Sequence, residues 1–248
     1  MRQEIQTASA ERFAMPKTNL PSERSPSRDI DAFLAKAASV PALSQVKGRL
    51  IFAIDATMSR QPTWDRAAEI QADMFGVADS VGGLAVQLVY FRGSGEFEAS
   101  EWTTSSSALA TRMRSVTCSS GSTQLRRVLT HAAAEARRTK VGALVYIGDC
   151  FEESPDTVVT EAAKLALLGI PAFMFHEGYD PSAAAIFNEI ARLTNGIYAR
   201  FDAGAARQLR DLLTAAAVYA TGGCLALKDY GDRVGGEVLR LSRGLGKK

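Results

Sequence analysis

Three oxygen-bearing side chains follow one apolar run at alternate positions. Residues 50–54 are apolar, Asp55 comes directly after them, and Thr57 and Ser59 follow. A carboxylate and two hydroxyls are hard donors, which suit Mg²⁺ or Mn²⁺ better than a soft metal. Such an apolar run is typical of a buried strand, and open α/β sheets bind ligands beyond the carboxyl ends of their strands. The pattern therefore predicts a divalent-ion site at the end of this strand.

Two later stretches can supply further donors to the same place. Residues 142–147 form another apolar run, which is followed by Gly148 and Asp149. In a doubly wound sheet, the first strand and the strand after the crossover flank the topological switch point. We therefore expect Asp55 and Asp149 to face one crevice. The small-residue loop that contains Thr123 opens a predicted helix, and it can deliver a third hydroxyl.

The types and order of these five residues resemble the metal-ion-dependent adhesion site of von Willebrand factor type A (VWA) domains. Asp55, Thr57 and Ser59 match the Asp-x-Ser-x-Ser motif of that site, with threonine in place of the first serine. Thr123 matches the threonine of its second loop, and Asp149 matches the aspartate of its third loop. The substituted threonine keeps the hydroxyl that the site needs.

The resemblance covers about residues 49–220 and implies a site that binds rather than catalyses. In the family, hydroxyls and a few carboxylates hold Mg²⁺, and a Glu or Asp of a partner protein commonly completes the coordination. The chain is therefore expected to be a protein-binding domain and no enzyme. The resemblance also suggests a bacterial protein. Bacterial relatives are often adaptors for AAA-type ATPases or stress assemblies, so such an assembly is one candidate partner.

Two other functions stay open. Haloacid-dehalogenase-like phosphatases also carry an aspartate at the end of the first strand, which would make Asp55 the nucleophile of a metal-dependent phosphoryl-transfer hydrolase. Those enzymes need a second aspartate two residues later, and here that position is Thr57. Alternatively, the chain is a scaffold with a vestigial site, in which Asp55, Ser59 and Thr123 are only helix N-caps. No Gly-Lys-Ser/Thr sequence follows a strand, which excludes a P-loop.

The other polar candidates are expected to be structural. His131 lies inside a predicted helix. His176 follows a strand at the edge of the crevice, where an ordinary loop position is favoured over a role at the rim. Glu152 and Glu153 are expected in a solvated loop that could shape the charge of the rim. Cys150 is expected to be a small buried residue, because no histidine neighbours it in sequence.

The elements that position these residues alternate along the chain between short apolar runs and helical patterns. This alternation predicts an α/β fold: a doubly wound, mostly parallel sheet with one antiparallel edge strand and helices on both faces, as in VWA and Rossmann-like folds. The predicted strands are 50–54, 84–91, 97–102, 142–147, 170–175 and 197–201. The predicted helices are 63–79, 106–113, about 125–138, 155–168, 181–193 and 205–219.

The ends of the chain differ from this pattern. Residues 1–28 are rich in Arg, Ser, Pro and Glu with few large apolar side chains, which predicts a disordered tail. A short amphipathic helix is predicted next, and Pro41 stops it. Gly222 and Gly223 are expected to break the last helix of the main domain. The predicted organisation is a tail at 1–28, a helix and linker at 29–48, a VWA-like domain at 49–220 and an appendage at 221–248.

Composition excludes several classes of function. The chain has 248 residues, 46% hydrophobic and 23% charged, which is ordinary for a soluble globular protein. A net charge of +2 without a basic helix, zinc spacing or RNA-binding motif argues against a nucleic-acid partner. Three widely spaced cysteines give no disulfide or metal pattern. The polar N-terminus and the lack of a window of ~18 apolar residues predict a cytoplasmic protein without a membrane partner.

Overall fold

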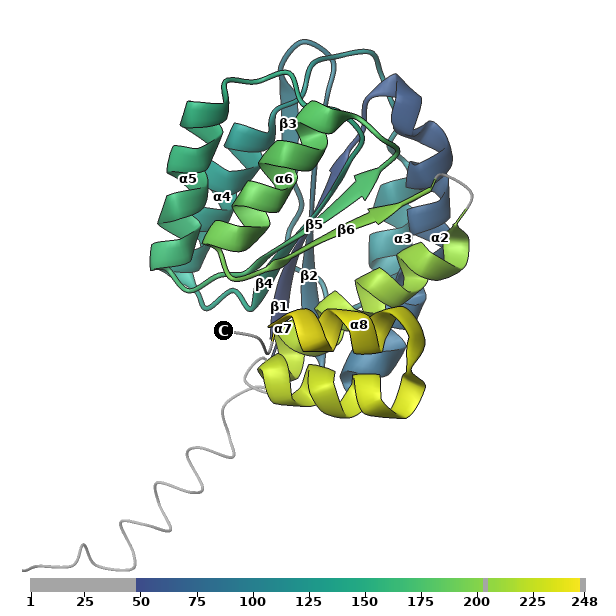
Figure 1. The fold of residues 1–248 in the computed structure, drawn as a ribbon. Helices are drawn as coiled ribbons and strands as arrows, with labels where there is room; N and C mark the ends of the chain where they lie inside the picture. The colour runs from purple at the N-terminus through teal and green to yellow at the C-terminus, as the bar shows by residue number, and fades with distance from the viewer. Residues whose placement is uncertain (1–47, 203–204, 246–248) are drawn as a thin grey trace, which may run out of the picture. The chain divides into compact units, whose positions relative to one another are not determined.

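The computed structural model describes residues 48–202 and 205–245. The predicted tail at 1–28 and the predicted helix before Pro41 lie outside these residues. Within the described part, a six-stranded sheet lies between two layers of helices (Figure 1). No helix in these two ranges is long and apolar enough to cross a membrane.

The sheet has the strand order β3-β2-β1-β4-β5-β6. All neighbouring strands pair in parallel except β2 and β3, which form an antiparallel hairpin at one edge. The first strand lies between β2 and β4, so the order reverses there, as the sequence predicts. The predicted fold class is therefore confirmed. The strands are β1 (Gly48–Asp55), β2 (Leu84–Arg92), β3 (Glu96–Ala99), β4 (Ala143–Gly148), β5 (Ala172–Glu177) and β6 (Ile197–Phe201).

The helices divide between the two faces of the sheet (Figure 1). One face is covered by α2, α3, α7 and α8, and the other by α4, α5 and α6. The described helices on the first face are α2 (Gln61–Asp79), α3 (Ser106–Arg114), α7 (Ala206–Val234) and α8 (Gly236–Leu245). Those on the second face are α4 (Leu125–Arg138), α5 (Pro155–Leu167) and α6 (Pro181–Leu193).

The central strand β1 shows how the two cores are built. Leu50, Phe52 and Ile54 belong to the core under α2 and α7, and Ile51 and Ala53 belong to the core under α4. Successive side chains of a strand point to opposite faces, so an unbroken apolar run is required where helices cover both faces. The run ends at Asp55 because the strand ends there, beyond the helical layers.

The boundaries of two predicted strands are wrong. The third strand ends at Ala99 instead of residue 102, and the chain beyond it makes only one isolated bridge, Val86 to Thr103. The fifth strand starts later and continues through Glu177, because its ladder with the last strand extends past the apolar residues. The break predicted at Gly222 and Gly223 is present. Gly223 takes φ 71° and ψ −162°, which is not a helical conformation, so the segment labelled α7 consists of two helices that meet at this residue.

Candidate metal centre

The two predicted aspartates lie at one edge of the sheet, at the ends of neighbouring strands. Ile54 pairs with Ile147 in the parallel ladder of the two strands, so Asp55 and Asp149 follow within one residue of the same level. Ligand atoms of Asp55, Asp149 and Cys150 lie within 4.8 Å of one another. Asp55 is fully buried and Asp149 is half-buried. The structure therefore brings the two carboxylates together.

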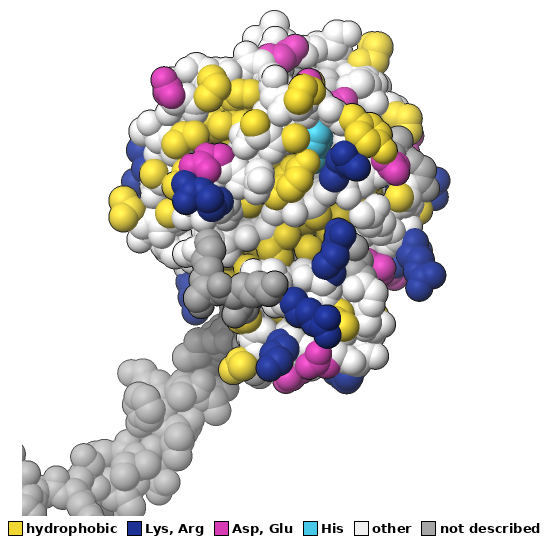
Figure 2. Space-filling view, in the orientation of Figure 1, with side chains coloured by type: hydrophobic (Ala, Val, Ile, Leu, Met, Phe, Trp, Pro, Cys, Tyr) yellow, Lys and Arg dark blue, Asp and Glu magenta, His cyan; other side chains and the backbone are white. Residues whose placement is uncertain are grey.

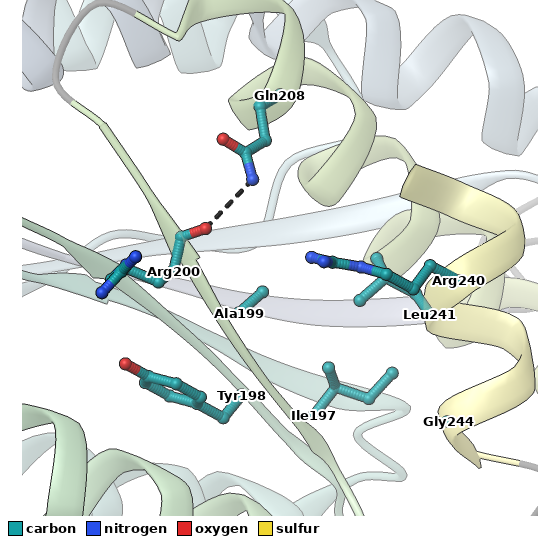
Figure 3. Close-up of a pocket in the computed structure, with 8 residues that line it drawn as sticks. All are labelled: Ile197, Tyr198, Ala199, Arg200, Gln208, Arg240, Leu241 and Gly244. Atoms are coloured by element: carbon teal, nitrogen blue, oxygen red, sulfur yellow. Dashed lines mark hydrogen bonds between the residues drawn. The ribbon is translucent and has the colours of Figure 1, made fainter. Parts of the chain in front are cut away.

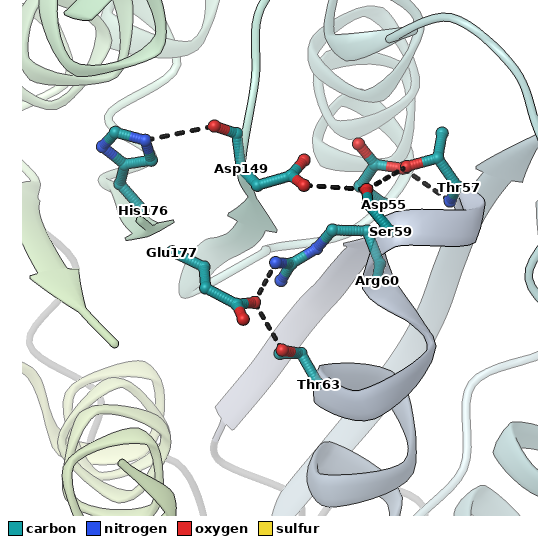
Figure 4. A network of polar contacts seen from close by, with 8 residues as sticks. All are labelled: Asp55, Thr57, Ser59, Arg60, Thr63, Asp149, His176 and Glu177. Atoms are coloured by element: carbon teal, nitrogen blue, oxygen red, sulfur yellow. Dashed lines mark hydrogen bonds and ion pairs between the residues drawn. The ribbon is translucent and has the colours of Figure 1, made fainter. Parts of the chain in front are cut away.

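The turn after β1 carries the two hydroxyls of the motif to these carboxylates. The Thr57 backbone N–H donates to Asp55 Oδ1 at 2.8 Å, which folds the chain over its own strand end. A 3-10 helix, η2 (Met58–Arg60), follows, and Ser59 Oγ donates to Asp149 Oδ2 at 2.8 Å. The hydroxyl oxygens of Thr57 and Ser59 lie 3.5 Å apart. Four of the five predicted ligands thus form one connected polar cluster (Figure 4).

Each aspartate keeps one oxygen without a hydrogen-bond partner. Asp55 Oδ2 and Asp149 Oδ1 are buried and accept no hydrogen bond within the described residues. Leaving such a buried acceptor unsatisfied costs about 1–3 kcal/mol, and more when the group is charged. Carboxylate and hydroxyl oxygens in one cluster are the donors that Mg²⁺ and Mn²⁺ prefer. The residues present therefore fit a small divalent ion.

The electrostatics of Asp55 agree with this fit. Burial raises the pKa of Asp55 to about 6, while hydrogen bonds from Thr57 and the positive charge of Arg60 oppose the rise. The negative charge of Asp149 adds to the rise in pKa. A cation beside a carboxylate favours its ionised form. A cation in this crevice would therefore stabilise the ionised forms of both aspartates.

Thr123, the fifth predicted ligand, makes its hydrogen bonds to the loop after β4. Its hydroxyl accepts from the Glu152 backbone N–H at 3.1 Å, and its own N–H donates to the Glu152 side chain at 3.2 Å. The segment before it is tied to the motif turn, since the Ser119 N–H donates to the Ala56 carbonyl at 3.0 Å. Thr123 thus adjoins the loop that carries Asp149, but no hydrogen bond within the described ranges joins it to the other four.

Glu152 and Glu153 lie in the loop after β4, where Glu152 is exposed as predicted, whereas Glu153 is half-buried against the start of α4. Glu153 accepts hydrogen bonds from the backbone N–H groups of Leu125 and Arg126, the first residues of that helix. These N–H groups have no partner inside the helix, and the helix dipole favours a negative charge beside them. Because 27 and 28 residues separate the partners, no local pattern could indicate the cap.

A buried ion pair that no pattern in the sequence predicts lies next to the aspartates. Arg60 is 1% exposed and pairs with Glu177, which also accepts a hydrogen bond from the Thr63 hydroxyl (Figure 4). Burial lowers the pKa of Arg60, whereas the charges of Asp149 and Asp55 oppose that change. Arg60 Nε and Nη2 have no hydrogen-bond partner within the described part of the chain.

Glu177 could have been found from the sequence, whereas Arg60 could not. Glu177 ends β5, the neighbour of β4, so the strand-end rule that selects Asp149 selects Glu177 as well. Arg60 directly follows Ser59, but an arginine after a strand is normally read as a solvated side chain. Only its buried acidic partner explains its position.

His176 and Cys150 flank Asp149 from two sides. His176 belongs to β5 and is fully buried, so the favoured loop position is wrong. Its ring nitrogens lie 3.0 Å from the Tyr198 hydroxyl and 3.2 Å from the Asp149 carbonyl, and burial lowers its pKa. Cys150 is half-buried, and burial together with the charge of Asp149 raises the pKa of its thiol to about 12. Both side chains therefore stay uncharged at neutral pH.

Comparisons with known proteins identify the fold. No protein-family model matches this sequence, and no curated protein matches it. An aerotolerance-related membrane protein from Bacteroides fragilis matches with a TM-score of 0.51 and 19% identity over 67% of this chain and 98% of that one. The VWA domain of SpRpn10 matches with a TM-score of 0.53 and 12% identity, over 72% and 97%.

A third solved structure carries a metal. It is the proximal thread matrix protein 1 of mussel byssus with a zinc-occupied MIDAS motif, the metal-ion-dependent adhesion site. Its TM-score is 0.51 at 17% identity, over 68% of this chain and 45% of that one. At such identities the likeness establishes the VWA fold alone.

Proposed function

We propose that this chain is a divalent-metal-dependent protein-binding domain, in which Mg²⁺ at the carboxyl edge of the sheet recruits a carboxylate of a partner protein. The observation that carries the proposal is the pair of buried oxygens, Asp55 Oδ2 and Asp149 Oδ1, which lack hydrogen-bond partners beside two hydroxyls. A cation is the ligand that such a pair best accommodates.

Each side chain of the cluster has its own role at the proposed metal site. Asp55 and Asp149 bind the ion, directly or through water, and the hydroxyls of Thr57 and Ser59 add neutral donors. Thr123 supplies a further hydroxyl from its loop. When bound, Mg²⁺ or Mn²⁺ provides a Lewis-acidic position that a partner's Glu or Asp can occupy. Few carboxylates around the ion leave it electrophilic, which favours that additional ligand.

Magnesium is proposed over zinc because the donors are hard oxygens. The mussel protein holds zinc in its adhesion-site motif, and Cys150 adds a thiol to this cluster. A thiol must lose its proton to bind zinc strongly, and the pKa of about 12 for Cys150 opposes that loss. Parallel titrations with Mg²⁺, Mn²⁺ and Zn²⁺ test this choice directly.

We further propose that the site is not catalytic and acts in a bacterial cytoplasm, where an AAA-type ATPase or a stress assembly is a candidate partner. The absence of catalysis is supported by the groups around Asp149. Both ring nitrogens of His176 have hydrogen-bond partners, and the thiol of Cys150 stays protonated. A haloacid-dehalogenase-like hydrolase would need a general acid at the position of Thr57. Metal-dependent turnover in a screen with phosphate esters would contradict the proposal that the site is not catalytic.

The test of the proposed function is capture of partner proteins on the immobilised chain with Mg²⁺ and with EDTA. We expect a specific partner to be retained with Mg²⁺, released by EDTA, and lost with Asp55→Ala. Changing the partner's acidic residue to its amide should remove binding as well. If binding is unchanged by EDTA and by the amide substitution in the partner, the proposal of a metal-bridged carboxylate is wrong.

One observation favours a second candidate, a scaffold with a metal-free site. The buried guanidinium of Arg60 already places a positive charge near both aspartates. However, Arg60 pairs with Glu177 and donates to neither aspartate, so their free oxygens remain without a partner. Calorimetric titration with Mg²⁺ distinguishes the two functions, because the scaffold predicts no heat of binding.

A further inference from the structure

The groove between β6 and α8 is separate from the metal centre. It encloses about 500 Å³ and shares no described lining residue with the polar cluster of Figure 4 (Figure 3). In the space-filling view, this face is a hollow with hydrophobic side chains on its floor and Lys and Arg side chains at its rim (Figure 2). Because no Asp or Glu is among its described lining residues, the groove adds no carboxylate to the metal centre.

Buried polar atoms without a partner gather instead at the carboxyl ends of β1 and β4. Seven buried side-chain atoms of the described residues lack a hydrogen-bond partner, and five of them belong to Asp55, Arg60, Asp149 and Tyr146. Tyr146 is 0% exposed, and the unsatisfied atom is its hydroxyl. Burying a hydroxyl without a partner is unfavourable, and such groups in native proteins usually bind ordered water or a ligand. The Tyr146 hydroxyl has no part in the metal site as described so far.

The strand register places this hydroxyl at the level of Asp55. Tyr146 pairs with Ala53, and both side chains belong to the core under α4. Asp55 lies two residues beyond Ala53, so its side chain points to the same face of the sheet. The residue of β4 level with Asp55 in this register is Gly148. A Cβ atom at Gly148 would lie 2.8 Å from the Tyr146 hydroxyl oxygen, so the hydroxyl lies directly against the residue opposite Asp55.

The neighbours of Tyr146 keep its hydroxyl in this place. Its ring stacks on Phe91, with the ring centres 6.4 Å apart, and meets Phe187 edge-on at 5.3 Å. In a close-packed core, a ring held between two others does not turn its hydroxyl toward solvent. Burial raises the pKa of Tyr146, the negative charge of Asp55 adds to the rise, and the positive charge of Arg60 opposes it. Both charged groups are therefore within electrostatic reach of the hydroxyl.

We propose that Tyr146 is a positioning residue of the metal site, and that its hydroxyl holds the Asp55 carboxylate through one water molecule. This inference rests on the proposed function. The Tyr146 O–H donates to the water, and the water donates to Asp55 Oδ2, so both unsatisfied atoms gain a partner. A carboxylate oxygen has two lone pairs, so Oδ2 can accept this bond and still bind the ion.

Such a contact should raise the affinity for metal. Side chains that hold a metal ligand in its orientation typically contribute about 10–100-fold to the affinity. Asp55 is fixed on its other oxygen by the Thr57 N–H, at 2.8 Å from Oδ1. The bond from the water therefore fixes the second oxygen, which is the one that faces the ion at the proposed site.

The test compares the wild type with Tyr146→Phe in the full chain. Phenylalanine keeps the ring and its packing and removes only the hydroxyl. Calorimetric titration with Mg²⁺ should show binding about tenfold weaker. The urea midpoint in EDTA should stay nearly unchanged, because the hydroxyl bonds directly to no described residue. Tyr219→Phe is the matched control, since it removes a half-buried phenol from α7, in the core on the other face, and should leave the Mg²⁺ affinity unchanged.

The failure of this inference differs from the failure of the proposed function. Equal Mg²⁺ affinity of the wild type and Tyr146→Phe would overturn the role of Tyr146 and leave the metal site intact. Weaker affinity together with a lower urea midpoint in EDTA would assign Tyr146 to the fold alone and would also overturn it. A wild type that binds no divalent ion would reject the metal site itself.

A crystal structure of the wild type with Mg²⁺ gives a second test, which does not depend on the folding of the variant. We expect a water at about 2.8 Å from both the Tyr146 hydroxyl and Asp55 Oδ2. An occupied metal site without this water would overturn the proposal.

Discussion

Ser59 and Asp149 are joined by a hydrogen bond of 2.8 Å, although 90 residues separate them in the sequence. The bond connects the turn after β1 to the loop after β4, so it joins the first and third parts of the motif. It uses one oxygen of Asp149 and leaves Oδ1 buried and without a partner among the described residues. At the proposed metal site, that oxygen would be available to the ion.

Excess Mg²⁺ should raise the melting temperature. A ligand that binds only the native state stabilises it by about 2.7 kcal/mol at 100 times its Kd. Asp149→Asn should abolish this increment, because the amide removes a charged donor from the cluster. Glu98→Gln on β3 is the matched control, since it removes an exposed carboxylate that lies two strands from β1 and outside the cluster. Scanning calorimetry in Mg²⁺ and in EDTA provides the measurement; identical curves for the wild type would indicate a vestigial site.

Replacing Arg60 should destabilise the protein strongly. Arg60→Met leaves Glu177 buried without its positive partner, which we expect to cost roughly 3–5 kcal/mol of unfolding free energy. The double variant Arg60→Met/Glu177→Gln should recover part of that loss, because no unpaired charge remains. Urea unfolding in EDTA measures the free energy of unfolding of the single and the double variant. If the double variant is as unstable as the single one, packing of the arginine matters more than its charge.

Glu153 should act on stability through α4. Glu153→Ala removes the acceptor for the first two N–H groups of the helix, and we expect a cost of about 1–2 kcal/mol. Glu153→Gln keeps an acceptor and should cost less. Partner binding should keep its salt dependence in both variants, since this glutamate binds the helix rather than solvent. A large change in salt dependence with unchanged stability would contradict the capping role.

Acid should weaken the fold through His131. Its Nε2 lies 2.9 Å from the Gln87 side chain, and burial lowers its pKa, with Arg138 acting in the same direction and Glu135 opposing. A histidine with a lowered native pKa stabilises the fold above its unfolded pKa of about 6.5, and this contribution is lost as the pH falls below that value. His131→Gln should therefore lose less stability than the wild type between about pH 7 and 5, as measured by urea unfolding in EDTA. Parallel pH profiles would show that other groups control the acid response.

The sheet could be predicted because its signals are local. The apolar run from Leu50 to Ile54 feeds two cores at once, and only a strand covered on both faces needs such a run. The switch point then follows from strand order, and it brings Asp55 beside Asp149. The kink at Gly223 has a local signal as well. Gly223 leaves the helical conformation, as predicted, and a second helix begins beyond it, in which Leu227 is buried in the core.

The contacts that complete the site could not be predicted, because they join loops distant in sequence. Thr123 reaches Glu152, and Arg60 reaches Glu177 across 117 residues. Each of these side chains alone resembles an ordinary surface residue. Their roles depend on burial, which is a property of the assembled sheet edge. The motif residues carry a signal in their spacing, whereas their surroundings do not.

The pairing of Arg60 with Glu177 also affects the net charge of the crevice, and so the valence of the ion that would neutralise it. Asp55, Asp149 and Glu177 bring three carboxylates around one guanidinium, so the described cluster keeps two uncompensated negative charges when all are ionised. One divalent cation would neutralise these two charges. A monovalent cation would leave one negative charge uncompensated, and a trivalent cation would add one positive charge in excess. The arginine cancels the charge of Glu177 and leaves the aspartates alone to set the valence. At the proposed metal site, the charge that the ion must neutralise would thus depend on Arg60, which is not one of the proposed ligands.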